Sequence, residues 1–192
     1  MTHDSGLELL GHLLETSHTL APDEIVAAVT QATTAVDAGD VAIYLADYEQ
    51  TVLVPLPDGT DRASLEIDTT LAGRAFTALA VQETDTGAGI RLWLPLLDGA
   101  ERLGVLGLTL PAADDTRRER STWLATLVAE LLMTKGQYTD SYSLARRRKP
   151  MSLAAEMQWQ LLPPLTFVTP RVVIAGLLEP AYEVAGTPST MP

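Results

Sequence analysis

Residues 92–110 read Leu-Trp-Leu-Pro-Leu-Leu-Asp-Gly-Ala-Glu-Arg-Leu-Gly-Val-Leu-Gly-Leu-Thr-Leu. Two apolar runs with strand composition, 90–97 and 103–110, flank the pair Asp98-Gly99. Glycine accepts the positive φ that a tight hairpin turn requires, so the pair favours a turn. The stretch therefore predicts an antiparallel β-hairpin, and small glycines in its second half would let helices approach closely.

A second hairpin is predicted upstream, where the apolar runs 41–46 and 51–56 are joined by four polar residues. Apolar residues at helical spacing predict helices over 6–19, from Pro22 to a stop at Gly39, and over 69–79. Hairpins rather than βαβ crossovers connect most of the strands. The expected fold class is α+β, an antiparallel sheet with helices packed on it.

A long helix is predicted from about Asp115. Its best apolar stripe is Leu124, Leu127, Val128, Leu131 and Leu132. Two interpretations of 117–135 stay open, a parallel coiled-coil connector and a terminal helix packed on the sheet. Residues 136–149 are expected to continue as an exposed helical connector, which Pro150 interrupts or ends.

Composition excludes several classes of function. The chain has no Cys, which rules out disulfides, thiolate metal sites and cysteine nucleophiles. The net charge of −12 is unevenly spread: residues 1–116 have 19 acidic and 4 basic side chains, a charge of −15, and residues 117–192 carry +3. An acidic domain is repelled by nucleic acid and by anionic membranes. The basic run 146–149 is interpreted as a solvated connector, with a nucleic-acid or lipid patch as the alternative. No signal peptide and no apolar stretch of about 20 residues is present, so we expect a cytoplasmic protein with no membrane contact.

Other catalytic patterns are weak. His12 and His18 lie six residues apart, on different sides of a helix, and His3 lies just upstream, so shared metal binding is not expected. No Gly-x-Ser-x-Gly sequence and no glycine-rich phosphate loop is present. Residues 117–192 contain no His, which argues against a histidine-kinase output.

Two segments resemble GAF domains over roughly residues 5–135. Residues 71–76, Leu-Ala-Gly-Arg-Ala-Phe, are similar to the start of the small helix of that family, and 92–110 to its closing hairpin. The resemblance implies a sensory domain over 1–135, which often encloses a small molecule between the sheet and the loops around the small helix. On this reading the pocket is lined by Tyr44, Arg74, Phe76 and Trp93.

The lid of that expected pocket would be the 57–69 and 81–90 loops. The alternative is that these residues are core aromatics and a surface arginine, in a domain that binds no ligand and serves only to dimerise. The resemblance also leads us to expect a homodimer, formed through the first helix and the 115–149 helix.

The C-terminal third carries a second resemblance. Glu156-Met157-Gln158-Trp159-Gln160-Leu161-Leu162-Pro163-Pro164 resembles the opening segment of SpoIIE-like (PPM-type) serine/threonine phosphatases, and Pro180-Ala181-Tyr182-Glu183-Val184-Ala185-Gly186 a later one. The segment 171–178 between them is expected to be a strand. The whole arrangement resembles actinobacterial GAF–phosphatase regulators, in which a complete phosphatase would use Mn or Mg and act on an anti-anti-sigma factor.

The sequence departs from that family at the metal site. The family places a metal-binding aspartate directly after two glycines, where this chain has Ala185, Gly186 and then Thr187. Two-metal hydrolysis needs carboxylates, and hydroxyls do not replace them. We therefore expect a helical connector over 136–150 and a truncated phosphatase start over 151–192, with no catalytic residues, no metal ligands and no cofactor.

Overall fold

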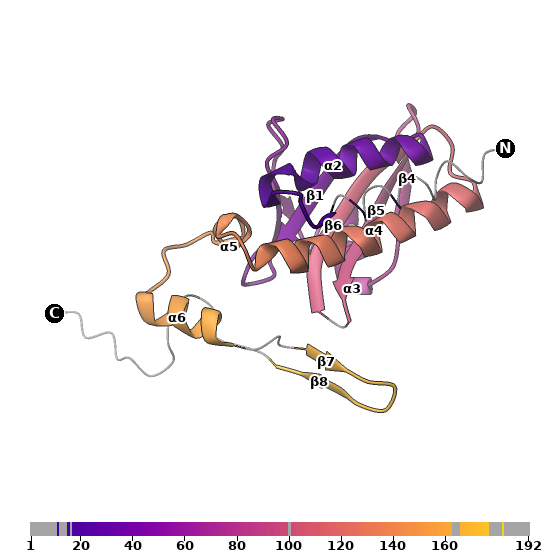
Figure 1. The fold of residues 1–192 in the computed structure, drawn as a ribbon. Helices are drawn as coiled ribbons and strands as arrows, with labels where there is room; N and C mark the ends of the chain where they lie inside the picture. The colour runs from indigo at the N-terminus through magenta and orange to yellow at the C-terminus, as the bar shows by residue number, and fades with distance from the viewer. Residues whose placement is uncertain are drawn as a thin grey trace.

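The computed structural model describes residues 11, 15, 17–99, 101–162, 166–176 and 182 (Figure 1). In chain order its elements are η1 (Pro22–Glu24), α2 (Ile25–Ala32), η2 (Thr33–Val36), β1 (Gly39–Ala46), β2 (Val52–Pro55), β3 (Leu65–Glu66), α3 (Leu71–Ala78), β4 (Gln82–Asp85), β5 (Ile90–Asp98), β6 (Glu101–Leu110), α4 (Asp115–Gly136), α5 (Ser141–Arg146), α6 (Leu153–Leu161), β7 (Thr166–Val168) and β8 (Val173–Ala175). Among these elements no helix is long and apolar enough to cross a membrane.

Six strands form one antiparallel sheet in the order β3-β2-β1-β6-β5-β4. Both predicted hairpins are present, β1 with β2 and β5 with β6. In the second, Gly99 has φ +59°, the conformation that the turn requires. β1 pairs with β6 at the centre, which closes the two hairpins into one sheet. The α+β class with helices flanking an antiparallel sheet is confirmed.

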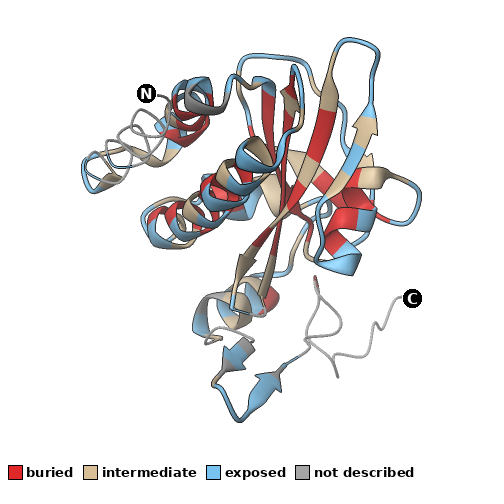
Figure 2. Ribbon diagram, turned by 90° about the vertical axis from the view of Figure 1, so that its right-hand side faces the viewer, coloured by how far each residue is buried: buried red, intermediate tan, exposed pale blue. Residues whose placement is uncertain are grey.

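The sheet is buried on both faces (Figure 2). Alternate residues of β5 explain this, because successive side chains of a strand point to opposite faces. Leu92, Leu94 and Leu96 are buried in a core with α2 and α4. Trp93, between them, packs into a second, smaller core beneath α3. The molecule therefore has three layers, with α2 and α4 on one side of the sheet and α3 on the other.

The leucine stripe of α4 packs on the sheet. The helix begins at the N-cap Asp114, whose carboxylate accepts a hydrogen bond from the Arg117 N–H at 2.8 Å. Leu124, Val128 and Leu131 then lie in the same core as the β5 leucines. Of the two interpretations of 117–135, the terminal helix packed on the sheet is the one that the contacts support.

The segment 136–149 differs from the expected exposed helix. α4 ends at Gly136, and α5 turns back towards the end of β1. Tyr142 explains the turn, because its ring is buried near Gly136 and its hydroxyl donates to the Pro22 carbonyl at 2.7 Å. A continuous helix would leave this aromatic ring in water.

Two expected loops contain short strands. β4 lies within 81–90 and pairs with β5 as an edge strand, while β3 lies within 57–69 and pairs with β2. β3 has only two residues and β4 is entirely polar, so neither shows the apolar alternation that identifies a half-buried strand. The helix expected over 6–19 lies largely outside the described residues, of which Gly11, Glu15 and Ser17 are helical.

Gly104 on β6 supplies a test of this packing. A Cβ at this position would lie 1.8 Å from the Tyr44 carbonyl oxygen, whereas one at Gly39 would meet nothing within 4 Å. We expect Gly104→Ala to lower the free energy of unfolding by at least about 2 kcal/mol through overpacking. Gly39→Ala, the matched control in β1, should change it by less than about 0.5 kcal/mol. Denaturant unfolding measures both, and equal stabilities would contradict the packing of β1 on β6.

Candidate functional site

The face of the sheet beneath α3 brings together three of the four expected pocket residues. Tyr44 and Phe76 are buried, and Trp93 is half-buried against the same cluster. The ring centroids of Tyr44 and Trp93 lie 5.9 Å apart in an edge-on contact. Burial raises the pKa of Tyr44, although the charges of Arg62 and Arg91 oppose this. These aromatic rings form an apolar layer between α3 and the sheet.

Arg74 does not join them. It lies on the exposed side of α3 and lines an open hollow of about 420 Å³ at the start of that helix. The other lining residues are Ile67, Asp68, Thr69, Thr70, Leu71 and Thr77. Three of the expected pocket residues therefore lie between α3 and the sheet, and the fourth, Arg74, lines this outer hollow.

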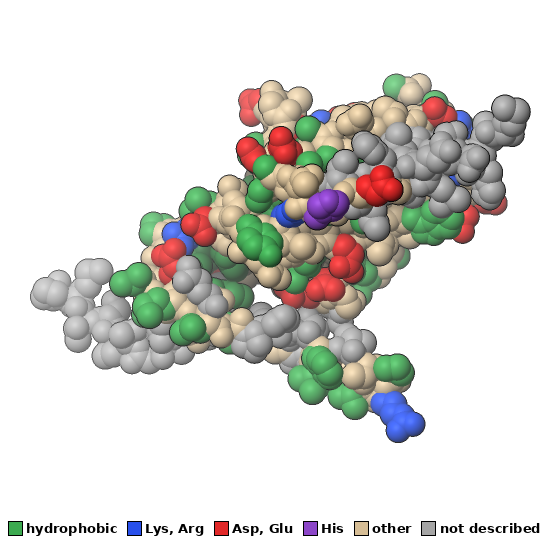
Figure 3. All heavy atoms as spheres, viewed as in Figure 1, with side chains coloured by type: hydrophobic (Ala, Val, Ile, Leu, Met, Phe, Trp, Pro, Cys, Tyr) green, Lys and Arg blue, Asp and Glu red, His purple; other side chains and the backbone are tan. Residues whose placement is uncertain are grey.

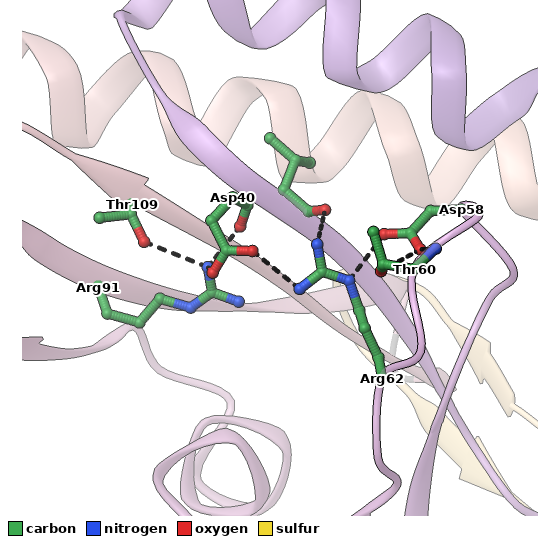
Figure 4. Close-up of polar contacts among 7 residues, drawn as sticks. Asp40, Asp58, Thr60, Arg62, Arg91 and Thr109 are labelled. Atoms are coloured by element: carbon green, nitrogen blue, oxygen red, sulfur yellow. Dashed lines mark hydrogen bonds and ion pairs between the residues drawn. The ribbon is translucent and has the colours of Figure 1, made fainter.

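A network of charges lies next to the aromatic layer, where Arg91 stacks on Trp93. Figure 4 shows the polar contacts of this network. Arg91 donates through Nη1 to the carboxylate of Asp40 at 2.9 Å, to the Asp40 carbonyl, and to the Thr109 hydroxyl at 3.3 Å. Arg62 donates through Nη1 to the other oxygen of the Asp40 carboxylate at 2.8 Å, and through Nε to Asp58 at 2.7 Å. Asp40 thus bridges two arginines that come from different elements.

Strand alternation and one glycine position Arg91. It is two residues before Trp93 on β5, so both side chains face α3, and its guanidinium lies 4.5 Å from the Trp93 ring centroid. A Cβ at Gly107 would lie 2.5 Å from Arg91 Nη2 and 2.6 Å from the Trp93 ring. Asp40 takes the left-handed φ of +45° at an irregularity of β1, which brings its carboxylate to both arginines.

Sequence reasoning missed Asp40, Arg62 and Arg91. A signal for Arg91 was present, because it is a lone charge in the apolar run 90–97, in step with Trp93 and out of step with the leucines. Period-two alternation alone places such a charge on the face of the tryptophan. Nothing local marked Asp40 or Arg62 as its partners, since they lie 51 and 29 residues earlier in the chain.

The surroundings shift the pKa values of the network residues to different extents. Burial lowers the pKa of Arg91, and the nearby carboxylate of Asp40 only partly offsets this. Burial raises the pKa of Asp58, but hydrogen bonds from Thr60 and Arg62 outweigh it and bring the value to about 2. Among the described residues no three His, Asp or Glu side chains are grouped so as to hold a metal ion.

A second cluster joins the C-terminal segment to the turn between β1 and β2. The Tyr48 ring of this turn lies 4.7 Å from the Trp159 ring of α6 and 6.3 Å from that of Tyr182. The guanidinium of Arg146, from α5, lies 4.8 Å from the Tyr48 ring, and its Nε donates to the Ala46 carbonyl at 2.9 Å.

Much of the basic run 146–149 is used in contacts within the chain. Lys149 pairs with Glu49 of the same turn at 2.7 Å, and Arg147 pairs with Glu156 of α6 at 3.1 Å. The run thus brings α5 and α6 to the turn between β1 and β2. This connecting role goes beyond the solvated segment that the sequence suggested.

Comparison with known proteins identifies the fold. No family model matches the sequence, and no curated protein matches it. Among solved structures, the GAF domain of a phosphoenolpyruvate-protein phosphotransferase from Coxiella burnetii gives a TM-score of 0.58 at 13% identity, over 69% of this chain and 95% of that one. The corresponding Acinetobacter domain gives 0.55 at 13% identity, over 71% and 97%. A putative GAF sensor protein from Burkholderia vietnamiensis gives 0.53 at 17% identity, over 71% and 99%. The expected GAF fold is confirmed.

The pKa of Asp58 gives a pH prediction. Its folded-state value near 2 lies below the ordinary 3.8, so the ionised carboxylate stabilises the folded chain fully above about pH 4. That contribution is lost as the pH falls towards 2. We expect wild type to be more stable than Asp58→Asn at pH 7 and the two to converge near pH 2, measured by denaturant unfolding. Asp61→Asn, in an exposed position of the same loop, is the control, and a difference that persists at pH 2 would contradict the assignment.

Proposed function

We propose that this chain is the sensory part of a bacterial signalling regulator, whose α3 face responds to a small molecule and whose state is passed to the C-terminal segment. The observation that carries the proposal is the packing of Tyr48 between Arg146 and Trp159. Through this one ring the turn at the end of β1 contacts both α5 and α6. A change in the sheet therefore has a direct route to the segment that follows the domain.

The turn itself is rigid enough to transmit such a change. The buried carboxylate of Asp47 accepts hydrogen bonds from the backbone N–H groups of Thr51 at 2.8 Å and Val52 at 3.0 Å, and from the Thr51 hydroxyl at 3.1 Å. These bonds fix the turn next to Tyr48. A shift of β1 against β2 would then move the Tyr48 ring rather than be absorbed in a loose loop.

The C-terminal segment exposes an apolar surface. Large apolar side chains are exposed on α6 and around the β7–β8 hairpin, which projects from the rest of the molecule (Figure 3). They are Leu153, Met157, Leu161, Phe167, Val172, Val173 and Ile174. A lone two-stranded hairpin is marginal in water, and an apolar surface of this kind is typical of a face that packs on other protein. This supports an output that continues the fold begun here.

The proposed output is a SpoIIE-like serine/threonine phosphatase. α6 (Leu153–Leu161) includes most of the segment that resembles its opening, and β8 lies within the predicted strand 171–178. With Thr187 at the position of the metal-binding aspartate, we propose that this chain is catalytically incompetent. A longer parent with the full set of carboxylates would use Mn²⁺ or Mg²⁺ and act on a phosphorylated anti-anti-sigma factor.

An activity assay tests the proposed absence of catalysis. With MnCl2 and p-nitrophenyl phosphate or a phosphoserine protein, we expect turnover no faster than buffer, because the carboxylates that would hold two metal ions are missing. A known PPM-type phosphatase in the same assay is the positive control. Metal-dependent turnover that EDTA removes would overturn this part of the proposal.

Hydrogen exchange tests the Tyr48 contact. We expect Tyr48→Ala to speed amide exchange in α5 and α6 by about tenfold, since stacked aromatic pairs are worth about 0.5–1.5 kcal/mol. β5 and β6 should keep their protection, because they lie in the sheet core. Tyr138→Ala is the matched control, as its side chain is 76% exposed just after α4. Unchanged exchange in α5 and α6 would refute the coupling.

A homodimer is proposed as part of the same function, and a ligand-free dimerisation module is the alternative. We place the dimer contact at Trp123 of α4, a large aromatic residue that is 42% exposed while the leucines of the helix face the core. We expect a dimer by light scattering and a monomer for Trp123→Glu, with Tyr138→Glu as the control. A wild-type monomer at all concentrations would contradict the proposal.

A further inference from the structure

We infer that Arg91 anchors a binding site for a small organic carboxylate, on the α3 face of the sheet beside Trp93 and Gly107. The inference rests on the proposed sensory function and deepens it, because it names the chemical class of the ligand. The proposed site does not include Arg74, which lines a separate exposed hollow at the start of α3.

The first argument is the unused edge of the Arg91 guanidinium. All three of its hydrogen bonds, to Asp40 and Thr109, leave from Nη1. Nε and Nη2 have no acceptor among the residues that the structure describes, although the side chain is only 9% exposed. These two nitrogens form the edge that binds a carboxylate through two parallel N–H···O bonds. Both nitrogens are open to solvent, since no enclosed side-chain nitrogen or oxygen of the described residues lacks a partner, so an incoming anion can reach them.

The second argument is the local charge. Arg91 shares its single carboxylate, that of Asp40, with Arg62, and the Asp40 side chain is 57% exposed. Asp58 pairs with Arg62 rather than with Arg91. Burial lowers the pKa of Arg91 despite the facing Asp40, so the protein's own charges do not fully offset the loss of water around this cation.

The same charges decide between classes of anion. Two arginines and two aspartates give the network no net charge, so a bound monoanion would leave it at −1 and a dianion at −2, which favours the monoanion. A phosphate dianion would meet Asp40 and Asp58 without a second free cation in the network. Arg62 is already occupied, since its three nitrogens donate to Asp58, Asp40 and the Val41 carbonyl.

The third argument is the surroundings of the free edge. Nη2 lies above Gly107, where the absence of a side chain makes room for the guanidinium. Trp93 packs against the guanidinium and is half-buried, which offers an aromatic surface to the organic part of a ligand. Thr84, the half-buried partner of Arg91 on β4, adds a hydroxyl on the same face.

Nuclear magnetic resonance of the arginine side chains tests the site directly. The ¹⁵N-labelled chain is titrated with sodium acetate and sodium benzoate, with sodium chloride at matched ionic strength and with inorganic phosphate. We expect a saturable shift of the Arg91 Nε–H signal, assigned by its loss in Arg91→Lys, with both carboxylates and not with chloride. Phosphate should bind more weakly.

Matched variants separate the effect of the paired guanidinium donors from the effect of the positive charge. Arg91→Lys keeps the charge and loses the paired donors, so we expect it to weaken carboxylate binding about tenfold or more. Arg74→Lys, on the outer side of α3, should bind as the wild type does. If Arg91→Lys does not fold, the Arg91 Nε–H signal is assigned through its bonded connection to the Arg91 backbone, and the wild-type titration decides the question.

Three results would overturn the inference: an Arg91 Nε–H signal that does not respond to either carboxylate, tighter binding of phosphate, or equal carboxylate affinity in Arg91→Lys. The exchange experiment on Tyr48→Ala contains no added anion. Failure of carboxylate binding with the Tyr48 coupling intact therefore refutes the ligand class alone. Loss of the coupling with carboxylate binding intact refutes the proposed route of signalling alone.

Discussion

The absence of a side chain at Gly107 is the constraint on which the α3 face of the sheet depends. Any Cβ there would overlap both Arg91 and Trp93, whose stacked side chains cross the strand at this point. Without that stack, Arg91 would have no apolar surface to cover its guanidinium. Asp40 would then have no buried cation to reach. The stack of Arg91 on Trp93, and with it the charge network, therefore depends on one close approach to β6.

The same network links a loop to the sheet. Arg62 comes from the segment between β2 and β3, and its guanidinium ties that segment to Asp58 and to Asp40 at the start of β1. Exposed ion pairs contribute little stability, and Asp40 is well exposed. The pairing is therefore better suited to setting the position of the loop than to holding the fold together. Stability comes instead from the two apolar cores on either side of the sheet.

Sequence reasoning found the parts of the fold that local patterns determine. Asp98-Gly99 predicts its hairpin because the turn conformation belongs to those two residues. The contacts of Arg91 could not be predicted in this way, since they require β1 and β6 to be placed beside β5. The turn of the chain after Gly136 could not be predicted for a similar reason. Its cause is the burial of Tyr142 against Pro22, 120 residues away.

β1 connects the two clusters that the structure reveals. Asp40 lies near its beginning, in contact with both arginines, and Ala46 at its end accepts a hydrogen bond from Arg146. Tyr48 follows two residues later. An anion at the free Nε–Nη2 edge of Arg91 would weaken the attraction between this cation and Asp40, which is held at Nη1. A ligand shifts an equilibrium only by its difference in affinity for two states. We expect two such states to differ at the irregularity of β1 beside Asp40, because the ladder is already interrupted there.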